Sequence, residues 1–301
     1  MNKLKYIFVV VAVFFLSGCI REILEKCWNV ELYFRYEYDG RDAFIEKIDK
    51  VNFYIFNEDN MLVESKEYLA NDLIDRKLSP IFHLQPGRYN VVAVGNMFDN
   101  TMVNGLNSQC LDSMYIHHPS KDLNITTYDR NYIGRSSFDL GAVTIFRDTV
   151  DMELSYMCLY FELTGIKTNE MSSEAMDEEE MPYKIVIENV NDRTNFSNEI
   201  IPGYYTKCYP KLYYNKKKGI ITSDVVYLYK FHKECNHVVK VYDVDQEVVA
   251  SVKLEDYLDD NSGIINPLIP EIRIPMEFKF VDMNFVIKVP DWTVVDINTH
   301  L

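Results

Sequence analysis

The sequence predicts an all-β protein with two β-sandwich domains in tandem. Aromatic residues make up 14% of the 301 residues, and Tyr, Phe, Val and Ile favour the half-buried surface of a pleated sheet. Short segments that alternate between apolar and polar residues recur about every ten residues, as is typical of sandwiches rather than of alternating α/β units. These segments are too many for one ordinary sandwich, so we place a domain boundary between residues 154 and 155.

The first twenty residues have the layout of a secretory signal peptide. Lys3 and Lys5 give a positive start, and residues 6–16 form an uncharged apolar run, which is the order expected of such a signal. The run of about eleven residues is shorter than the roughly 20 that a membrane-spanning helix needs. The following Leu16-Ser17-Gly18-Cys19 matches the lipobox of bacterial lipoproteins. We therefore predict a signal peptide over residues 1–18, rather than a membrane anchor helix with a chance cysteine.

Cys19 is the predicted attachment point of the lipid. A diacylglycerol donor can alkylate its thiol, and after cleavage the new amino group can take a further acyl chain. Because each buried methylene contributes about 0.8 kcal/mol, two or more chains hold a protein firmly on a membrane. Residues 19–27 then form a lipidated tether, which is short enough to keep the folded part close to the bilayer.

Charge and composition exclude some partners. The formal net charge is −15 at pH 7, and a chain with this charge repels nucleic acid and gains nothing from anionic lipid head groups. We therefore expect no nucleic-acid partner. The 48% share of hydrophobic residues is too high for a disordered chain.

Lipidation of Cys19 leaves an odd number of cysteines. The other five are Cys27, Cys110, Cys158, Cys208 and Cys235. Five thiols cannot all pair within one chain, so at least one is free or bonds to another chain. Their wide spacings specify no disulfide framework.

The first predicted domain covers residues 28–154. Residues 30–38 alternate between apolar and polar side chains, as a half-buried strand does, and Asp39-Gly40 ends them with a turn signal. Residues 88–95 are apolar on both faces, which indicates a central strand. Further strands are predicted at 51–56, 80–84, 123–128, 138–146 and 149–154, with one helical turn near Leu111.

The second predicted domain covers residues 155–301, where the strand pattern starts again. Leu254, Tyr257 and Leu258 have helical spacing and predict one short helix. Residues 169–181 are polar and indicate a surface loop. Strands are predicted at 159–164, 183–190, 204–214, 224–231, 238–242, 247–252, 272–280, 285–289 and 293–297.

Chemical motifs are mostly missing from the sequence, so we expect neither an enzyme nor a cofactor. No nucleophile elbow, zinc-protease motif, phosphate-binding loop or dinucleotide fingerprint occurs. A weak metal candidate is the group His232, Cys235 and His237, which Cys208 could join, although ordinary turn polarity explains the group without a metal and is the preferred interpretation. A structural zinc site needs four convergent ligands. The pair His117-His118 indicates an exposed loop.

Taken in order, several segments resemble one family. They are the lipobox, the strand Val30–Tyr38, the segments Ile48–Asn60 and Leu84–Asn96, the segment Val150–Gly165, and a closing strand with Trp292. This order is similar to that of the anchor, or minor, subunits of type V fimbriae within the fimbrillin superfamily. The resemblance implies two transthyretin-like sandwiches and a lipid-anchored place at the outer membrane and cell surface. It also implies a fimbrial stalk subunit as partner, joined by strand exchange.

The C-terminal strands are the expected donors in this exchange. Pro270, Pro275 and Pro290 lie in or beside them, and proline is confined mainly to edge strands, strand starts and bulges. An edge strand can pair with another chain through its backbone. The alternative is that these strands only complete the second sandwich. The predicted inward anchors are Phe278, Phe280, Phe285, Ile287, Val289 and Trp292.

Two other functions stay open at this stage. Stalk subunits of this family are cut after an arginine downstream of the cysteine. Here Arg21 is too close to the lipid and Arg35 lies in a strand, so we expect an uncut anchor. If the chain is instead a stalk or tip subunit, Arg41 is the expected site. A surface glycan-binding lipoprotein is the other alternative, with exposed tyrosines as a stacking platform: Tyr204, Tyr205, Tyr213, Tyr214, Tyr227 and Tyr229.

Overall fold

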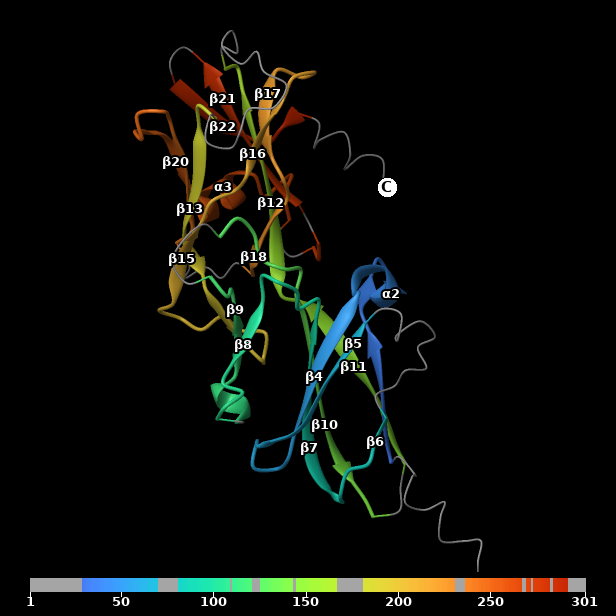
Figure 1. The fold of residues 1–301 in the computed structure, drawn as a ribbon. Coiled ribbons are helices and arrows are strands. Elements are labelled where there is room, and N and C mark those ends of the chain that lie inside the picture. Colours follow the sequence, from blue (N-terminus) through green and yellow to red (C-terminus); the bar gives the residue numbers. More distant parts are fainter. Residues whose placement is uncertain are drawn as a thin grey trace, which may run out of the picture.

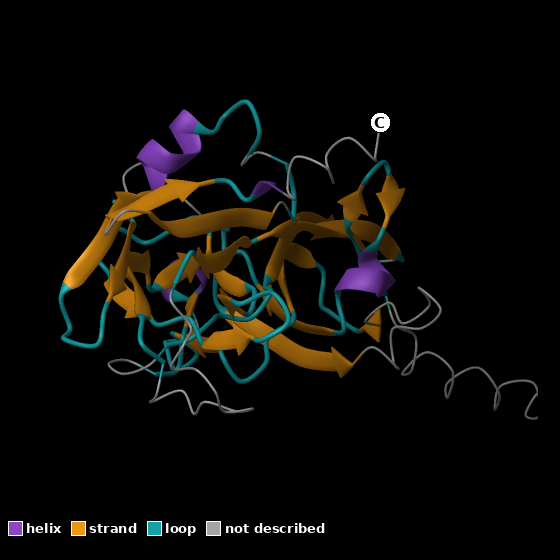
Figure 2. Ribbon diagram, turned by 90° about the horizontal axis from the view of Figure 1, so that it is seen from above, coloured by secondary structure: helices purple, strands orange, loops and turns teal. Residues whose placement is uncertain are grey.

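The structure is a computed structural model that describes residues 29–69, 81–108, 110–120, 125–142, 145–166, 181–230, 236–266, 269–271, 273–281 and 284–291. Strands make up nearly all of the regular structure in these residues, and the helices are few and short (Figure 2). The predicted all-β class is confirmed, whereas the transthyretin-like topology and the domain limits stay predictions. In Figure 1 the first half of the chain lies at one end of an elongated molecule, and the second half at the other.

The first half of the chain consists of strands of two to nine residues and two short helical turns. Its elements are β1 (Val30–Arg35), β2 (Glu37–Tyr38), β3 (Arg41–Asp42), α2 (Phe44–Lys47), β4 (Lys50–Phe56), β5 (Leu62–Leu69), β6 (Ile81–Phe82), β7 (Gly87–Gly95), β8 (Met102–Asn104), η3 (Leu111–Ser113), β9 (Tyr115–His117), β10 (Tyr132–Leu140) and β11 (Phe146–Leu154). One helical turn, α2, lies before β4, and the other, η3, lies between β8 and β9. The predicted helical turn near Leu111 is confirmed as η3.

One seven-stranded sheet organises this half and folds back on itself. Its strand order is β5-β4-β7-β10-β11-β1-β6. β11 pairs with β10 only through its last residues, 152–154, while residues 146–151 pair with β1. The sheet therefore bends at β11, and its two parts enclose one hydrophobic core between them.

β7 lies at the centre of this sheet, as its sequence predicts. It pairs with β4 on one side and with β10 on the other. Val91 and Ala93 belong to the core inside the folded sheet, whereas Val92 and Val94 belong to a second core on the opposite face. All four are fully buried. Burial on both faces explains why residues 88–95 do not alternate between apolar and polar.

The second half of the chain begins directly after β11. Its elements are β12 (Tyr156–Thr164), β13 (Lys184–Asn191), β14 (Arg193–Asn195), β15 (Tyr205–Cys208), β16 (Leu212–Asn215), β17 (Ile220–Ser223), β18 (Val226–Tyr229), β19 (Val238–Tyr242), β20 (Val248–Lys253), α3 (Leu254–Asp260), β21 (Arg273–Val281) and β22 (Asn284–Lys288). The short helix predicted from Leu254, Tyr257 and Leu258 is confirmed as α3, and all three residues are buried.

Two sheets form a sandwich in this half. One has the order β16-β17-β12-β21-β22, with β18 also paired to β12, and the other has the order β15-β13-β19-β20. β21 runs parallel to β12 and antiparallel to β22. Residues from both sheets, such as Phe161 and Phe278 on one and Ile187 and Val241 on the other, share one core.

A long excursion between β7 and β10 joins the two halves. We call residues 96–131 the crossing segment. Its strands β8 and β9 form a small sheet with β14, which belongs to the second half. Ile116, Ile125 and Tyr128 are buried in the same core as the second-half sandwich.

Several predicted strand limits are wrong. In place of the strand predicted at 138–146, β10 ends at Leu140 and β11 begins at Phe146. The strand predicted at 204–214 is two strands, β15 and β16, and Pro210 lies between them because it cannot donate a ladder hydrogen bond. Residues 125–128 form no strand, and Ile125 makes only an isolated bridge to Cys208. The sequence pattern also contains no indication of α2, β3, β5, β8, β9, β14 and β17.

Candidate functional site

The first strand is paired inside its own chain. β1 runs parallel to β11, in register from Val30↔Phe146 to Arg35↔Asp151, and its start pairs with β6. Val30 and Leu32 are fully buried, and Phe34 is nearly so. Because burying a large apolar side chain contributes roughly 1.5 to 3 kcal/mol, β1 is an integral part of the first-half core.

Asn29 fixes the chain directly before β1. Its side-chain Nδ2 donates to the carbonyl oxygen of Leu84 at 2.7 Å, and its Oδ1 accepts from the Leu84 amide at 2.9 Å. Its own carbonyl accepts from the Phe146 amide at 2.8 Å. Cys19 lies outside the described residues, so its lipidation stays a prediction. Asn29 is ten positions after Cys19, so a fully extended chain between the two spans at most roughly 35 Å.

Arg35 and Arg41, the two described arginines considered for cleavage, lie in paired strands. Arg35 ends β1 and donates from Nε and Nη2 to the carboxylate of Asp151, at 2.7 and 3.0 Å. Arg41 lies in the hairpin of β2 and β3 and forms a two-pronged ion pair with Glu46 of α2. Arg21 lies outside the described residues.

The predicted donor residues fall on the last two described strands and beyond them. β21 lies between β12 and β22, and Phe278 on it is fully buried in the core of its own sandwich. β22 is the last strand of this sheet among the described residues. Phe285 on β22 packs against Phe280 and Tyr183, with ring centroids 5.3 and 5.7 Å away. Ile287 is half-buried, Val289 is buried, and Trp292 lies outside the described residues.

The metal candidate stays untested because His232 and Cys235 lie outside the described residues. His237 is buried just before β19, and Cys208 is fully buried. No group of three possible ligands occurs among the residues that the structure describes. The expectation for His117-His118 is wrong, since both are buried, at 7% and 5% exposure. Burial lowers the pKa of His118.

The described cysteines form no disulfide. Cys110, Cys158 and Cys208 are free thiols, while Cys27 and Cys235 lie outside the described residues. Burial raises the pKa of Cys158 to about 12, so this thiol stays protonated and is a poor nucleophile. It is a small buried hydrophobe in β12.

The six tyrosines of the glycan-binding alternative do not all reach the surface. Tyr204, directly before β15, and Tyr205, its first residue, are 44% and 46% exposed, and Tyr213 on β16 is 45% exposed. Tyr229, however, is fully buried in the second-half core. Tyr214 and Tyr227 are partly buried and pack against the two cores. The predicted platform is therefore wrong in at least Tyr229, which packs its ring 4.7 Å from Tyr128.

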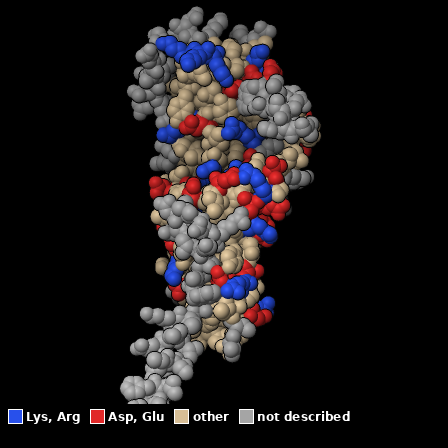
Figure 3. All heavy atoms as spheres, turned by 90° about the vertical axis from the view of Figure 1, so that its right-hand side faces the viewer, with Lys and Arg blue, Asp and Glu red and all other residues tan. Residues whose placement is uncertain are grey.

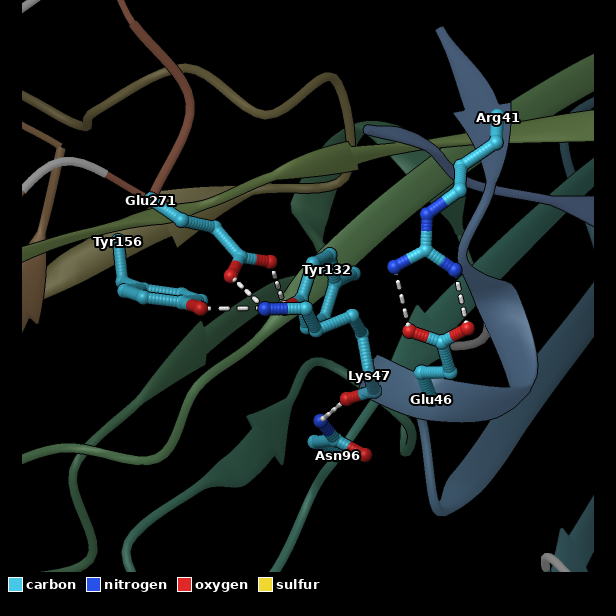
Figure 4. A network of polar contacts seen from close by, with 7 residues as sticks. All are labelled: Arg41, Glu46, Lys47, Asn96, Tyr132, Tyr156 and Glu271. Carbon is cyan, nitrogen blue, oxygen red and sulfur yellow. Dashed lines mark hydrogen bonds and ion pairs between the residues drawn. The ribbon is translucent and has the colours of Figure 1, made fainter. Parts of the chain in front are cut away.

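A polar network between the halves is the most connected group of side chains that the structure adds (Figure 4). Glu271, in the loop before β21, forms an ion pair with Lys47 of α2. The hydroxyl of Tyr132 on β10 donates to the other oxygen of Glu271 at 2.9 Å. Tyr156, at the start of β12, places its hydroxyl 3.1 Å from that of Tyr132. We call these four residues the junction network.

Burial sets the protonation of the junction network. Removal from water raises the pKa of Tyr132, and its hydrogen bond with Tyr156 adds to this rise. The pKa values of Tyr156 and of neighbouring Tyr36 are raised mainly by burial as well, with the charge of Glu271 contributing. All three phenols therefore stay neutral near pH 7, and Tyr132 can donate to the carboxylate. Asn96 supports the network from below, donating to the carbonyl of Lys47 at 2.8 Å.

The crossing segment provides a second tie between the halves. The Tyr128 amide donates to the Tyr227 carbonyl, and the Tyr227 amide donates to the Thr127 hydroxyl, both at 2.9 Å. The Tyr209 amide donates to the carbonyl of Ile125 at 2.6 Å. These bonds attach the segment to β18 and to the residue after β15, so it forms part of the second-half sandwich.

No sequence signal points to the junction network or to the crossing segment. Lys47 and Glu271 are 224 residues apart, and the network consists of ordinary surface residue types.

Among the described residues, no helix is long and apolar enough to cross a membrane. On the face shown in Figure 3, acidic and basic side chains are interspersed.

Comparisons with known proteins identify a family and a fold. The sequence matches the family model of fimbrillin-A associated anchor proteins Mfa1 and Mfa2 over residues 24–298. No curated protein sequence matches it. The fimbrial anchor protein Mfa2 of Porphyromonas gingivalis shares the fold, with a TM-score of 0.62 at 13% identity, over 87% of this chain and 95% of that one.

Two Bacteroides thetaiotaomicron structures are also similar. One, described as an adhesin candidate, has a TM-score of 0.68 at 16% identity, over 88% of this chain and 96% of that one. The other, described as a candidate polysaccharide-binding protein, has a TM-score of 0.69 at 15% identity, over 89% and 97%. At these identities the likeness shows a shared fold.

Proposed function

This chain belongs to the family of fimbrillin-A associated anchor proteins, and from that premise we propose that it ties a fimbrial polymer to the outer membrane and ends the polymer there. A lipid on Cys19 would hold the membrane side, and a fimbrial stalk subunit would be the partner on the other side. The proposal has no catalytic step and needs no cofactor.

The position of β1 is the single observation that carries this proposal. When subunits join by strand exchange, a neighbour can enter only where a subunit lacks one of its own strands. Here β1 fills its place along β11, with Val30, Leu32 and Phe34 buried. Within the part of the chain that the structure describes, the strand position along β11 is therefore already filled, and growth would stop there.

The donor in this exchange is assigned to β22 and the residues after it. β21 is enclosed between β12 and β22, and withdrawing it would remove Phe278 from the core. Among the described strands β22 pairs with β21 alone, so it can leave or extend at lower cost. Among the predicted donor residues, this assignment keeps Phe285, Ile287, Val289 and Trp292. It leaves out Phe278 and Phe280, which both lie on β21.

The stalk-or-tip alternative receives less support. Cleavage after Arg41 would have to open the hairpin of β2 and β3 and break the ion pair with Glu46. It would also leave β1 attached only through its own pairing with β11 and β6.

Deleting the gene and examining the cells by electron microscopy tests the proposal. The deletion strain should shed its fimbriae into the medium. A strain with Cys19→Ala should show the same shedding, with the protein unprocessed or released from membranes. A strain that lacks the residues after Pro290 should shed fimbriae while the protein stays on the membrane.

The three strains separate the parts of the proposal. A normal number of attached fimbriae in the deletion strain would rule out the anchor role. Normal membrane fractionation of the Cys19→Ala protein would reject lipidation alone. Normal attachment in the C-terminal truncation, with the protein folded, would reject only the donor assignment.

A further inference from the structure

The outward faces of β1 and β11 carry complementary charges. Along β1 the outward residues are Glu31, Tyr33 and Arg35, which are acidic, neutral and basic in turn. Along β11 their direct partners are Arg147, Thr149 and Asp151, which are basic, neutral and acidic. We call these six residues the charge ladder.

The charged pairs of the ladder are in contact. The Nε of Arg147 donates to Oε2 of Glu31 at 2.6 Å. Arg35 donates to both carboxylate oxygens of Asp151. The hydroxyl of Tyr33 donates to the second oxygen of Glu31 at 2.7 Å. Both rungs therefore join residues 116 positions apart in sequence, and neither can form through local structure alone.

The ladder and the buried face of β1 have different physical roles. The buried face of β1 consists of Val30, Leu32 and Phe34. Any other strand with alternating apolar residues could bury a similar apolar face along β11. Ion pairs with exposed partners add little stability, yet opposite charges across a contact fix its register and reject wrong partners. The ladder can thus discriminate where the core face cannot.

Register shows how strict this discrimination is. A shift of one residue would turn the apolar face of β1 outward. A shift of two would set Glu31 beside Thr149 and Tyr33 beside Asp151, so both native ion pairs would be lost. Arg35 would then face Glu153, which restores one pair, while Glu31 would have no base opposite it. A shift of four would set Glu31 beside Asp151, which places two like charges together. Only the native register satisfies both rungs.

We propose that Arg147 and Asp151 select the strand that fills the groove along β11. The strand they accept has alternating apolar residues inside and, on its outward face, an acid followed four positions later by a base. The chain's own β1 is such a strand. This selection rests on the proposed function in one respect: a terminal subunit must keep this groove closed against strands of other subunits.

Hydrogen exchange on the full-length protein tests the selection with a charge-reversal cycle. One variant reverses β1 (Glu31→Lys with Arg35→Glu), a second reverses β11 (Arg147→Glu with Asp151→Lys), and a third carries all four changes. Each reversed strand remains tethered in the same chain, so it is presented at the same effective concentration as native β1. The measured quantity is the exchange rate of the amides of residues 30–35, relative to those of central strand β7.

We expect each single reversal to speed this exchange about tenfold and the fourfold variant to return to the native rate. In 1 M salt, where charges are screened beyond about 3 Å, the differences should shrink. Equal protection in all four proteins would overturn the proposal. So would a fourfold variant that stays as open as the single reversals, because pairing would then not depend on matched charges.

Lys207→Glu serves as the matched control. Lys207 pairs with Glu188 in the second half, and their side chains are 52% and 18% exposed, close to 58% and 15% for Arg147 and Glu31. The Lys207→Glu substitution should leave the amide exchange of β1 unchanged. Faster exchange in β1 would count against a local effect of the charge ladder. If the variant with reversed β11 does not fold, a variant with Arg147→Gln and Asp151→Asn replaces it, because it removes the ion pairs without adding repulsion. We expect it to speed exchange of residues 30–35 by about half as much as a reversal.

The cycle needs no fimbriae, so its outcome is separate from that of the anchor proposal. If the fourfold variant regains native exchange while the deletion strain keeps normal attached fimbriae, strand selection stands and the anchor role is rejected. If the fourfold variant does not regain native exchange while the deletion strain sheds its fimbriae, the anchor role stands and strand selection is rejected.

Discussion

Glu271 joins the second half of the chain to the first through two polar contacts. It accepts from Lys47 and from Tyr132 while its side chain is only 11% exposed. Its backbone has φ of 59°, a left-handed conformation that costs a non-glycine residue energy and persists only when the surroundings hold it. The strain and the paired carboxylate together indicate that the loop is fixed by the junction network.

We expect Glu271→Ala to lower the free energy of unfolding by about 1 to 3 kcal/mol, because it leaves two partly buried donors without their acceptor. Glu271→Gln should cost less, since it keeps an oxygen for Tyr132. Urea denaturation measures both. Glu46→Ala is the control, because its ion pair with Arg41 is exposed and should change stability far less. Equal effects of Glu271→Ala and Glu46→Ala would contradict the assigned role.

Tyr54 should make the protein sensitive to alkali. Burial, with a contribution from the charge of Glu67, raises its pKa to about 12. A raised pKa means that the unfolded state loses its proton first, so this stability is present below about pH 10 and declines as the pH rises toward 12. A shift of this size corresponds to roughly 2 to 3 kcal/mol. Tyr54→Phe should flatten the fall in unfolding free energy between pH 10 and 12, and an unchanged slope would count against it.

At the scale of elements, the strength of the local pattern decides what can be predicted. β1 and β21 alternate between apolar and polar residues, and β4, β7 and β12 have long apolar runs, so the sequence places all five well. β10 does not, because its middle reads Gly134-Arg135-Ser136-Ser137, which is typical of a loop. It is nevertheless a long central strand paired with β7 along its whole length. Its strand form comes from its neighbours and not from its own side chains.

Gly134 shows why β10 needs this unpromising sequence. A Cβ at this position would lie 2.7 Å from the carbonyl oxygen of Asp151 and 2.8 Å from Cγ1 of Val150. We expect Gly134→Ala to push β10 from β11 and to lower stability by about 1 to 3 kcal/mol, measured by thermal unfolding. Gly263→Ala is the control, since nothing lies within 4 Å of its added Cβ. Equal stability of both variants would show that the sheet yields at no cost.

Phe285 tests β22 as a whole element. Phe285→Asp would place a charge against Phe280 and Tyr183, whereas Val286→Asp next to it alters a side chain that is 50% exposed. We expect shed fimbriae with Phe285→Asp and attached fimbriae with Val286→Asp, counted by electron microscopy. Circular dichroism of both proteins verifies the fold. Shedding by both variants would point to general damage of the edge strand.

The whole molecule should unfold as one unit, because the crossing segment belongs to both halves. Ile116, which precedes β10 in sequence, is fully buried in the core of the second-half sandwich. We therefore expect a single calorimetric transition, and Ile116→Ala should lower its midpoint without splitting it, at a cost of about 2 to 5 kcal/mol. Two separate transitions would show that the halves are independent.

At this scale the sequence predicts the class and the family more readily than the contacts. Period-two alternation and an ordered set of weak strand signatures were sufficient for both. The junction network and the charge ladder could not be predicted, since each joins residues more than a hundred positions apart. Such pairs become visible only when topology brings Glu31 next to Arg147 and Lys47 next to Glu271.

The parallel pairing of β1 with β11 has a consequence for mechanical load. A pull on the N-terminus acts on β1 at Asn29, while the second half holds β11 at Leu154, where the chain passes into β12. Because the strands are parallel, these two points lie at opposite ends of the pair. The force is therefore shared by all the backbone hydrogen bonds between β1 and β11 at once. An antiparallel partner would put both points at one end, where the bonds would break one by one. The topology thus loads the attachment in shear rather than in peeling.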